Sequence, residues 1–376
     1  MYKLIKNISI YFFVFCIILF IAEIFARYVI PYSGGIAKAK LWYEYRLQNP
    51  AAYKNSPYDA KKLIKEAFEI RHVQVDGNLQ PLDRKGMYIN IKNNKRVTTD
   101  QPINYTNKIF IFGGSTIFNS EVPDKFTIAS FLQRLININY NKKYKVINYG
   151  VSGLTIEDQL RKITQIKFNE NDIVILYDGI NEIYQYLYRG SFEKNIISED
   201  RERLEKLNFF SRNYILFFDK YGGNYSFLFR RFLNPYASPK EYKYELKIKN
   251  LEAFNNNYYK NLIQIKNFST INKIKYYHFL QPNLFQKKNK LNYEKELIDN
   301  QWLTPKGTKH AFDFFIKNKL YLDSFILESM INSKSLLNIF DNIEEPIYLD
   351  YMHINEVGNE IVAKEFYKTL KENNLL

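Results

Sequence analysis

Three short segments, far apart in the chain, carry side chains that could together transfer an acyl group from an ester. They read Gly113-Gly114-Ser115-Thr116, Asp178-Gly179-Ile180-Asn181-Glu182 and Asp350-Tyr351-Met352-His353. A serine hydroxyl such as that of Ser115 is a weak nucleophile near neutral pH, so it needs a base beside it. His353 can be that base if Asp350 fixes its tautomer and steadies the imidazolium, and the Asn181 amide can stabilise the developing oxyanion. The sequence therefore predicts a serine enzyme that acts on esters.

The fold must bring these segments together, and the flanking sequence indicates how. Each segment follows a short apolar run of the kind that forms a buried parallel strand. The predicted strands cover residues 108–112, 144–148, 172–177, 275–280 and 346–349, and helical spacing occurs at 126–136, 156–166 and 357–370. Strands that alternate with helices predict a parallel sheet joined by right-handed crossovers. Because the carboxyl ends of parallel strands form the ligand crevice of an open α/β sheet, we expect the three segments to meet there.

The amino-terminal residues 1–30 predict a transmembrane signal anchor. Residues 7–22 carry no charge, and a helix over residues 4–30 would be roughly 40 Å long, more than the roughly 30 Å of a bilayer core. A cleaved signal peptide is the alternative, but no clear small-x-small cleavage site follows the apolar stretch. Basic residues on the two sides of the span are balanced, so charge leaves its orientation open.

The rest of the chain divides into a connecting part and a catalytic domain. Residues 31–106 have mixed polarity and one plausible helix at 60–70, and they are interpreted as a stalk or as an elaboration packed on the core. Residues 107–376 form the predicted catalytic domain. Within this domain the alternation of strands and helices is interrupted at about 184–271, a stretch rich in tyrosine, phenylalanine, lysine and asparagine. This stretch is expected to be a helical insertion that buries its aromatic residues, or a lid that shapes the site.

Composition excludes several other classes of function. The net charge of +15 comes from lysines spread along the chain, without an arginine-rich run or a recognisable nucleic-acid module, so no nucleic-acid partner is expected. The single cysteine, Cys16, rules out an internal disulfide and a cysteine-based metal site. No clustered metal-ligand spacing and no nucleotide-binding glycine pattern is present, so no metal and no cofactor is predicted.

Several residues compete with this interpretation. Ser152, in Gly150-Val151-Ser152-Gly153, lacks the second glycine of a Gly-x-Ser-x-Gly elbow and is interpreted as a helix cap. Asp178 and Glu182 could be the carboxylate pair of a glycosidase, but that reading leaves Ser115 and His353 unexplained. The remaining histidines, His72, His278 and His310, are expected to be structural or solvated.

The three segments resemble the motif blocks of the SGNH (GDSL-like) hydrolase superfamily, over about residues 107–370. The first block of that family is usually Gly-Asp-Ser; here it reads Gly113-Gly114-Ser115-Thr116, as in membrane-anchored and glycan-modifying branches. Asn148-Tyr149-Gly150 is similar to the second block. Gly179-Ile180-Asn181 is similar to the third, and Asp350-Tyr351-Met352-His353 to the last.

The resemblance implies both a fold and a set of roles. The fold would be a flavodoxin-like, three-layer α/β/α core with a five-stranded parallel sheet. Ser115 would be the nucleophile, His353 the base and later the acid, and Asp350 the residue that orients it. The oxyanion hole would combine the backbone N–H groups of Ser115 and Gly150 with the Asn181 side chain. The turns that carry these groups would depend on the glycines Gly113, Gly114 and Gly179.

Together these observations predict a membrane-anchored serine esterase that acts on acyl groups of envelope glycans or lipids. An O-acetyltransferase of an envelope polysaccharide would use the same residues, because the two reactions differ in how well the site excludes water. A third alternative is an inactive glycan-binding or assembly protein of the envelope. The resemblance implies an extracytoplasmic (periplasmic) catalytic domain and a possible association with envelope-polysaccharide machinery.

Overall fold

The computed structural model describes residues 2–28, 50–75, 78–140, 143–183, 251–299 and 332–376. The described residues fall into two units, with the amino-terminal helix in the first and all the others in the second. Most of the predicted insertion, residues 184–250, lies outside the described part of the chain, as does His310. The last part of that insertion, residues 251–271, is a helix.

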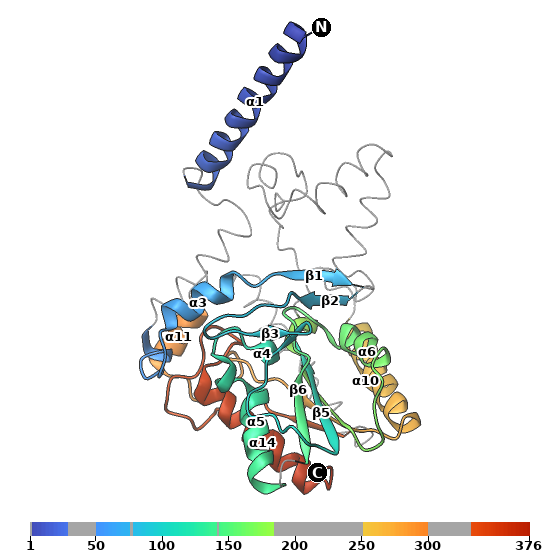
Figure 1. Cartoon of the computed structure of the whole chain (residues 1–376). Coiled ribbons are helices and arrows are strands. Elements are labelled where there is room, and N and C mark those ends of the chain that lie inside the picture. The colour runs from blue at the N-terminus through green and yellow to red at the C-terminus, as the bar shows by residue number, and fades with distance from the viewer. Residues whose placement is uncertain (1, 29–49, 76–77, 141–142, 184–250, 300–331) are drawn as a thin grey trace. The chain divides into compact units, whose positions relative to one another are not determined.

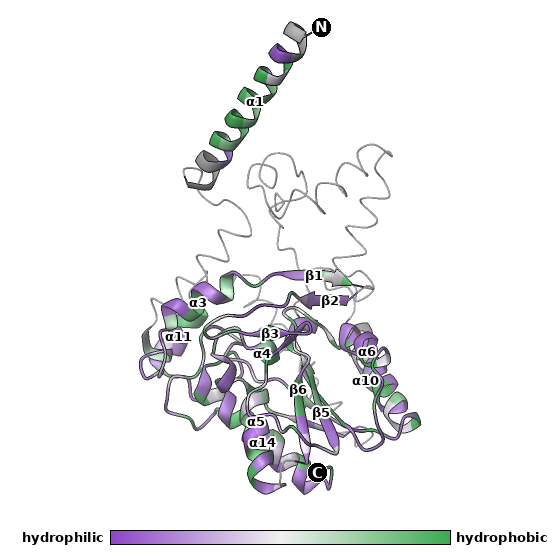
Figure 2. Cartoon of the chain, in the orientation of Figure 1, coloured by the Kyte–Doolittle hydropathy of each residue, from purple (hydrophilic) through white to green (hydrophobic). Residues whose placement is uncertain are grey.

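The amino-terminal unit is a single described helix, α1 (Tyr2–Tyr28). Its window Lys6–Glu23 has a mean hydropathy of 1.8 over 18 residues, and none of the residues in that window is buried. Figure 2 shows the central turns of this helix coloured almost continuously as hydrophobic residues. By length and composition α1 is able to cross a membrane or to act as a signal sequence.

A parallel sheet of five strands forms the centre of the second unit (Figure 1). Its strands are β5 (Asn107–Gly113), β6 (Tyr144–Asn148), β7 (Ile173–Asp178), β8 (Lys275–Leu280) and β9 (Ser333–Ser335). They lie in the order β6-β5-β7-β8-β9, and every neighbouring pair is parallel. The predicted five-stranded parallel sheet is confirmed.

Helices cover both faces of the sheet, because successive residues of each strand point to opposite sides. In β5, Ile109 and Ile111 join the core under α5 (Ile128–Asn139) and α14 (Glu356–Glu372), whereas Phe110 and Phe112 join the core under α6 (Ile156–Thr164) and α10 (Leu251–Ile271). Both faces are apolar, which is why the strands read as continuous hydrophobic runs in the sequence. The result is the predicted three-layer α/β/α arrangement.

The fifth strand is not the predicted one. Residues 346–349 were expected to form it, but Ser333–Ser335 does so, as a half-buried edge strand with polar side chains and no apolar signal. The apolar residues Ile347, Tyr348 and Leu349 are buried in a loop that turns back on itself. The Leu349 N–H donates to the His353 carbonyl at 2.8 Å, and the Asn355 N–H donates to the Ile347 carbonyl at 3.0 Å. The hydrophobic run therefore anchors the loop that carries His353.

Residues 50–106 pack on this core. They include α3 (Ala60–Phe68) and two antiparallel hairpins, β1 (His72–Val75) with β2 (Asn78–Pro81) and β3 (Ile91–Lys92) with β4 (Lys95–Arg96). The hydroxyls of Ser56 and Tyr58 each donate to the Glu356 carboxylate at 2.7 Å, at the start of α14. The Asn78 amide donates to the Gln165 side chain at 2.7 Å, just after α6.

Candidate active site

Ser115, His353 and Asp350 form a chain of hydrogen bonds at the carboxyl edge of the sheet. Ser115 is the first residue of α4 (Ser115–Phe118), directly after β5. Its Oγ lies 2.8 Å from His353 Nε2, and His353 Nδ1 lies 2.8 Å from Asp350 Oδ2. Asp350 is 0% exposed and His353 is 2% exposed, whereas Ser115 is half-buried. The residue that would attack a substrate, Ser115, is therefore the most exposed of the three.

The local backbone fixes the orientation of the Asp350 carboxylate. Its Oδ1 accepts the N–H groups of Met352 at 2.9 Å and His353 at 2.7 Å, so the carboxylate is held by its own turn. Because Nδ1–H of His353 donates to this carboxylate, Nε2 carries the lone pair that faces Ser115. The arrangement can therefore accept the proton of the Ser115 hydroxyl as its oxygen becomes a nucleophile.

Asn181 approaches the same turn from the end of β7. Its Nδ2 donates to the Leu154 carbonyl at 2.9 Å, and an amide nitrogen carries a second N–H. A Cβ atom on Gly114 would lie 2.2 Å from Asn181 Nδ2, so a side chain at position 114 would displace the amide. This contact gives a physical reason for the glycine that replaces the usual aspartate of the first motif block.

Gly150 makes a different hydrogen bond from the one expected of an oxyanion donor. Its N–H donates to the Asn148 side-chain oxygen at 2.8 Å, and the Asn148 amide in turn donates to the Ile117 carbonyl at 2.7 Å. A Cβ on Gly150 would lie 2.3 Å from the Phe118 nitrogen, so the glycine permits close packing against α4. The buried Asn148 was missed by the sequence analysis, and it links the end of β6 to the turn of Ser115.

Glu121 is a second residue that sequence reasoning missed. It is buried, and its Oε1 lies 3.9 Å from His353 Nε2, on the side of the ring that faces Ser115. The Ser120 hydroxyl donates to this Oε1 at 2.9 Å, and the Tyr53 hydroxyl donates to the Glu121 carbonyl at 3.2 Å. Two carboxylates, those of Asp350 and Glu121, therefore lie near opposite nitrogens of one imidazole.

A buried polar network lies beneath Asn181. His278 Nε2 is 3.1 Å from Asp178 Oδ1 and 2.8 Å from the Tyr258 hydroxyl, which also donates to Asp178. Glu182 accepts the N–H groups of Gly179 and Ile156 at 2.8 and 2.5 Å. Burial, reinforced by the nearby Asp178, raises the pKa of Glu182.

These contacts bear on three of the sequence interpretations. Asp178 and Glu182 are buried and hold the loop of Asn181 in place, an arrangement that gives no support to the glycosidase alternative. His278 is fully buried and structural, as expected. Gly179, which has a φ of 116°, lies in the region that favours glycine, where β7 turns into this loop.

The prediction that Ser152 caps a helix is wrong. Ser152 lies in a turn, and Thr155 is the N-cap of α6, in a capping box with Asp158. The box signal, Thr-x-x-Asp, was present in the sequence three residues farther along.

His72 lies half-buried in β1, where burial and the charge of Lys162 lower its pKa.

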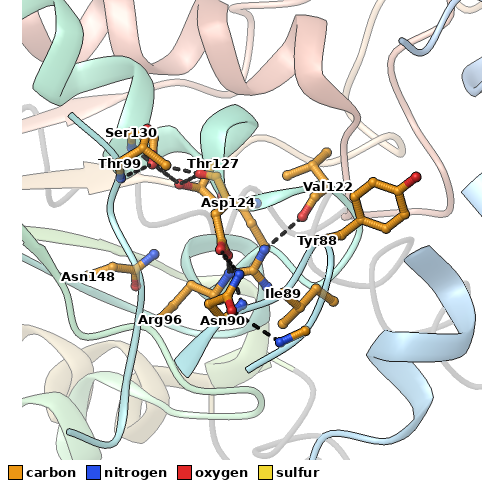
Figure 3. A network of polar contacts seen from close by, with 12 residues as sticks. Tyr88, Ile89, Asn90, Arg96, Thr99, Val122, Asp124, Thr127, Ser130 and Asn148 are labelled. Atoms are coloured by element: carbon orange, nitrogen blue, oxygen red, sulfur yellow. Dashed lines mark hydrogen bonds and ion pairs between the residues drawn. The ribbon is translucent and has the colours of Figure 1, made fainter. Parts of the chain in front are cut away.

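An ion pair from β4 braces the segment that follows Ser115 (Figure 3). Arg96 is buried, with its Nε 2.8 Å from Asp124 Oδ1, and its Nη2 donates to the Val122 carbonyl at 2.8 Å. Asn90 donates to both oxygens of the same carboxylate, from its backbone at 3.1 Å and from its amide at 2.7 Å. Residues from the amino-terminal elaboration thus fix the loop that contains Glu121.

Among the residues that the structure describes, no group of three or more His, Cys, Asp or Glu could hold a metal ion.

Residues 109–366 match the family model of GDSL-like Lipase/Acylhydrolase. No curated protein matches the chain. Among solved structures, an acetyl xylan esterase is 13% identical, with a TM-score of 0.38, and the match covers 70% of this chain and 99% of that one. A putative lipolytic protein of the G-D-S-L family from Desulfitobacterium hafniense is 10% identical over 70% and 99% of the two chains, with a TM-score of 0.37. A catalytic mutant of an acetylxylan esterase from Geobacillus stearothermophilus is 12% identical over 71% and 95%, also with a TM-score of 0.37.

Proposed function

Because the chain belongs to the GDSL-like lipase/acylhydrolase family, we propose that it is a membrane-anchored serine esterase whose nucleophile is Ser115. The hydrogen-bonded chain from Ser115 through His353 to Asp350 is the observation that carries this proposal. Ser115 and the other two residues come from opposite ends of the domain, and Asp350 is buried whereas Ser115 is half-buried. That combination matches what a serine nucleophile needs.

The reaction follows from the geometry in two steps. Ser115 Oγ attacks the ester carbonyl carbon while its proton moves to His353 Nε2, and Asp350 stabilises the imidazolium. The oxyanion is held by the Ser115 backbone N–H and the Asn181 amide. The alcohol leaves with the proton from Nε2, and the acyl group stays on Ser115. Water then attacks this acyl-enzyme with His353 as base, which releases the acid and restores the hydroxyl.

The proposed location follows from α1. A helix of this length and hydropathy fits an uncleaved membrane anchor that would hold the catalytic unit near a membrane surface. The extracytoplasmic side is proposed from the resemblance to glycan-modifying branches, because the charges that flank the helix are balanced. Acyl esters of envelope glycans or lipids are the proposed substrates. An acyltransferase would pass the acyl group from Ser115 to a sugar hydroxyl instead of to water, and the products distinguish the two reactions.

The test uses the full-length protein in detergent with 4-nitrophenyl acetate and octanoate. We expect turnover and an acetyl adduct on the intact protein, and both should vanish in Ser115→Ala. Ser152→Ala is the matched control, because Ser152 lies in a nearby turn and has no role in the proposed reaction; it should keep full activity. If the folded wild-type protein shows neither adduct nor turnover with either ester, or if Ser115→Ala retains them, the proposal is wrong.

A further inference from the structure

Two lysines meet at one tyrosine ring beside the candidate active site. The Lys95 amine, from β4, lies 5.0 Å from the centre of the Tyr149 ring, and the Lys162 amine, from α6, lies 5.9 Å from it. Tyr149 follows β6, directly before Gly150, and its ring stacks on Phe112 at 5.0 Å. Two separate elements, β4 and α6, thus bring positive charge to one ring that follows β6.

Lys162 is buried to an unusual degree for a lysine. It is 9% exposed, and buried charges in proteins are normally paired. In the part of the chain that the structure describes, no carboxylate lies within ion-pair distance of Lys162 or of Lys95. Burial, together with the charge of Lys95, lowers the pKa of Lys162 to about 8, so its amine is still mostly protonated at pH 7. The protein therefore keeps a cation here at a cost in stability.

The nearest acidic groups are occupied elsewhere. Asp158 pairs with Arg161 at 2.6 Å and accepts hydrogen bonds from Thr155. Asp83 accepts the N–H groups of Asn93 and Asn94 at 2.9 and 2.6 Å. The Tyr149 phenol cannot serve as the counter-ion, because burial raises its pKa above the ordinary value and keeps it neutral. Positive charge is therefore in excess around this ring.

The Lys95 amine donates to the Asn93 carbonyl at 2.9 Å, whereas polar atoms of His72 and Gln159 lack hydrogen-bond partners within the described residues. His72 Nε2 is buried without one, and the pKa of this histidine responds to the charge of Lys162. Gln159, one helical turn before Lys162 and fully buried, has no partner for either amide atom. Buried polar groups in proteins normally have hydrogen-bond partners. A polar ligand bound beside Lys162 would supply the partners that these groups lack.

The position of this cluster connects it to Ser115. The His72 ring lies 5.9 Å from the ring of Phe118, the last residue of α4, whose first residue is Ser115. Tyr149 precedes Gly150, which packs against the same short helix. We propose that Lys162, Lys95 and His72 form a subsite for an oxyanion, a carboxylate or phosphate, carried by the ester substrate. The substrate part of this inference rests on the proposed esterase function, whereas binding of the anion does not.

The first experiment measures binding without turnover. Lysines of the full-length protein are methylated with formaldehyde and cyanoborohydride, and the rate at each site is followed by peptide mass spectrometry. Inorganic phosphate should slow methylation of Lys162 and Lys95, also in Ser115→Ala, and chloride at the same ionic strength should not. Lys145 is the matched control, because its amine also lies near a tyrosine ring, 5.2 Å from that of Tyr105, away from Tyr149. Phosphate should leave the rate of Lys145 methylation unchanged.

The second experiment asks whether the anion belongs to the substrate. An acetylated methyl glucuronoside is compared with its neutral methyl ester, and wild type should prefer the charged compound in kcat/KM by about 10- to 100-fold, the range expected for a charged hydrogen bond. Lys162→Met should remove most of this preference, while Lys162→Arg and Lys145→Met should keep it.

The two experiments together distinguish a substrate subsite from a site for a free oxyanion. Protection by phosphate together with the charge preference supports a substrate subsite. Protection without the preference overturns the substrate part and leaves a site for a free oxyanion. No selective protection of Lys162, whether or not the enzyme turns over esters, overturns the subsite. A failure of the esterase proposal appears separately, as absence of the Ser115 adduct while the protection by phosphate remains.

Discussion

The contact between Gly114 and Asn181 predicts that adding one methyl group should disable the site. In Gly114→Ala the new Cβ would lie 2.2 Å from Asn181 Nδ2, so the amide must move by more than about 1 Å to reach an ordinary contact distance. The amide is also held by the Leu154 carbonyl at 2.9 Å, which opposes that movement. We therefore expect Gly114→Ala to remove the Asn181 donor from the oxyanion.

The expected size of the effect follows from what one such donor contributes. Loss of a single oxyanion donor lowers kcat by about 10²- to 10³-fold. KM should change little, because the interaction is made in the transition state. The assay is the kcat for hydrolysis of 4-nitrophenyl acetate by Gly114→Ala, Asn181→Ala and the double variant. Since both changes remove the same interaction, the double variant should be no slower than Asn181→Ala alone.

Gly153→Ala is the control for this comparison. Gly153→Ala places a methyl group in the neighbouring turn, where no atom lies within 4 Å. It should lower stability, because Gly153 has a φ of 81°, but it should leave kcat near the wild-type value. If Gly114→Ala keeps kcat within about threefold of wild type, or if the two losses multiply in the double variant, the reasoning is refuted.

Three further predictions concern the buried groups. Asp350→Asn should lower kcat by about 10³- to 10⁴-fold, since the histidine loses the carboxylate that fixes its tautomer; a loss below tenfold in steady-state kinetics would argue against that role. Lys162→Met should raise the free energy of unfolding at pH 7 by up to about 3 kcal/mol, because folding lowers the pKa of Lys162 from 10.5 to about 8. The unfolded chain binds this proton more tightly than the folded protein does. The free energy of unfolding of the wild type, measured in urea, should therefore rise relative to that of Lys162→Met between about pH 8 and 10.5. A difference that stays constant over this pH range would contradict the prediction. Arg96→Met should destabilise the protein by about 3–5 kcal/mol, because it leaves the Asp124 carboxylate buried and unpaired; adding Asp124→Asn should recover part of the loss in thermal unfolding.

Much of the fold could be predicted because its signals are local. The strands β5, β7 and β8 are buried on both faces over most of their length, and each produces an apolar run in the sequence, whereas the edge strand β6 is partly buried. The convergence of Ser115 and Asn181 follows from the position of their segments at the ends of β5 and β7, whereas His353 is carried by a buried loop. Residues 346–349 misled the prediction, because an apolar run indicates burial but does not distinguish a strand from a buried loop.

The parts that could not be predicted depend on long-range contacts. The edge strand β9 has polar side chains, and only its hydrogen bonds to β8 define it as a strand. Glu121 and Asn148 are ordinary polar residues in the sequence, and their positions become informative only when His353 and Gly150 are folded against them. The unpaired charge of Lys162 cannot be read from the sequence either, because it depends on where the hairpin β3–β4 packs.

The hydrogen bonds from Ser56 and Tyr58 to Glu356 also determine when this protein can finish folding. The residues in the Ser56 pair are separated by 300 positions, and those that link Ser115 to His353 by 238. At about 5–20 residues per second, a ribosome needs roughly 15–60 s to make the intervening chain. During that interval residues 50–59 have no partner at α14, and Ser115 has no base. A chain interrupted before residue 350 keeps the four long strands and the nucleophile, yet it lacks both the histidine and the helix that close the domain.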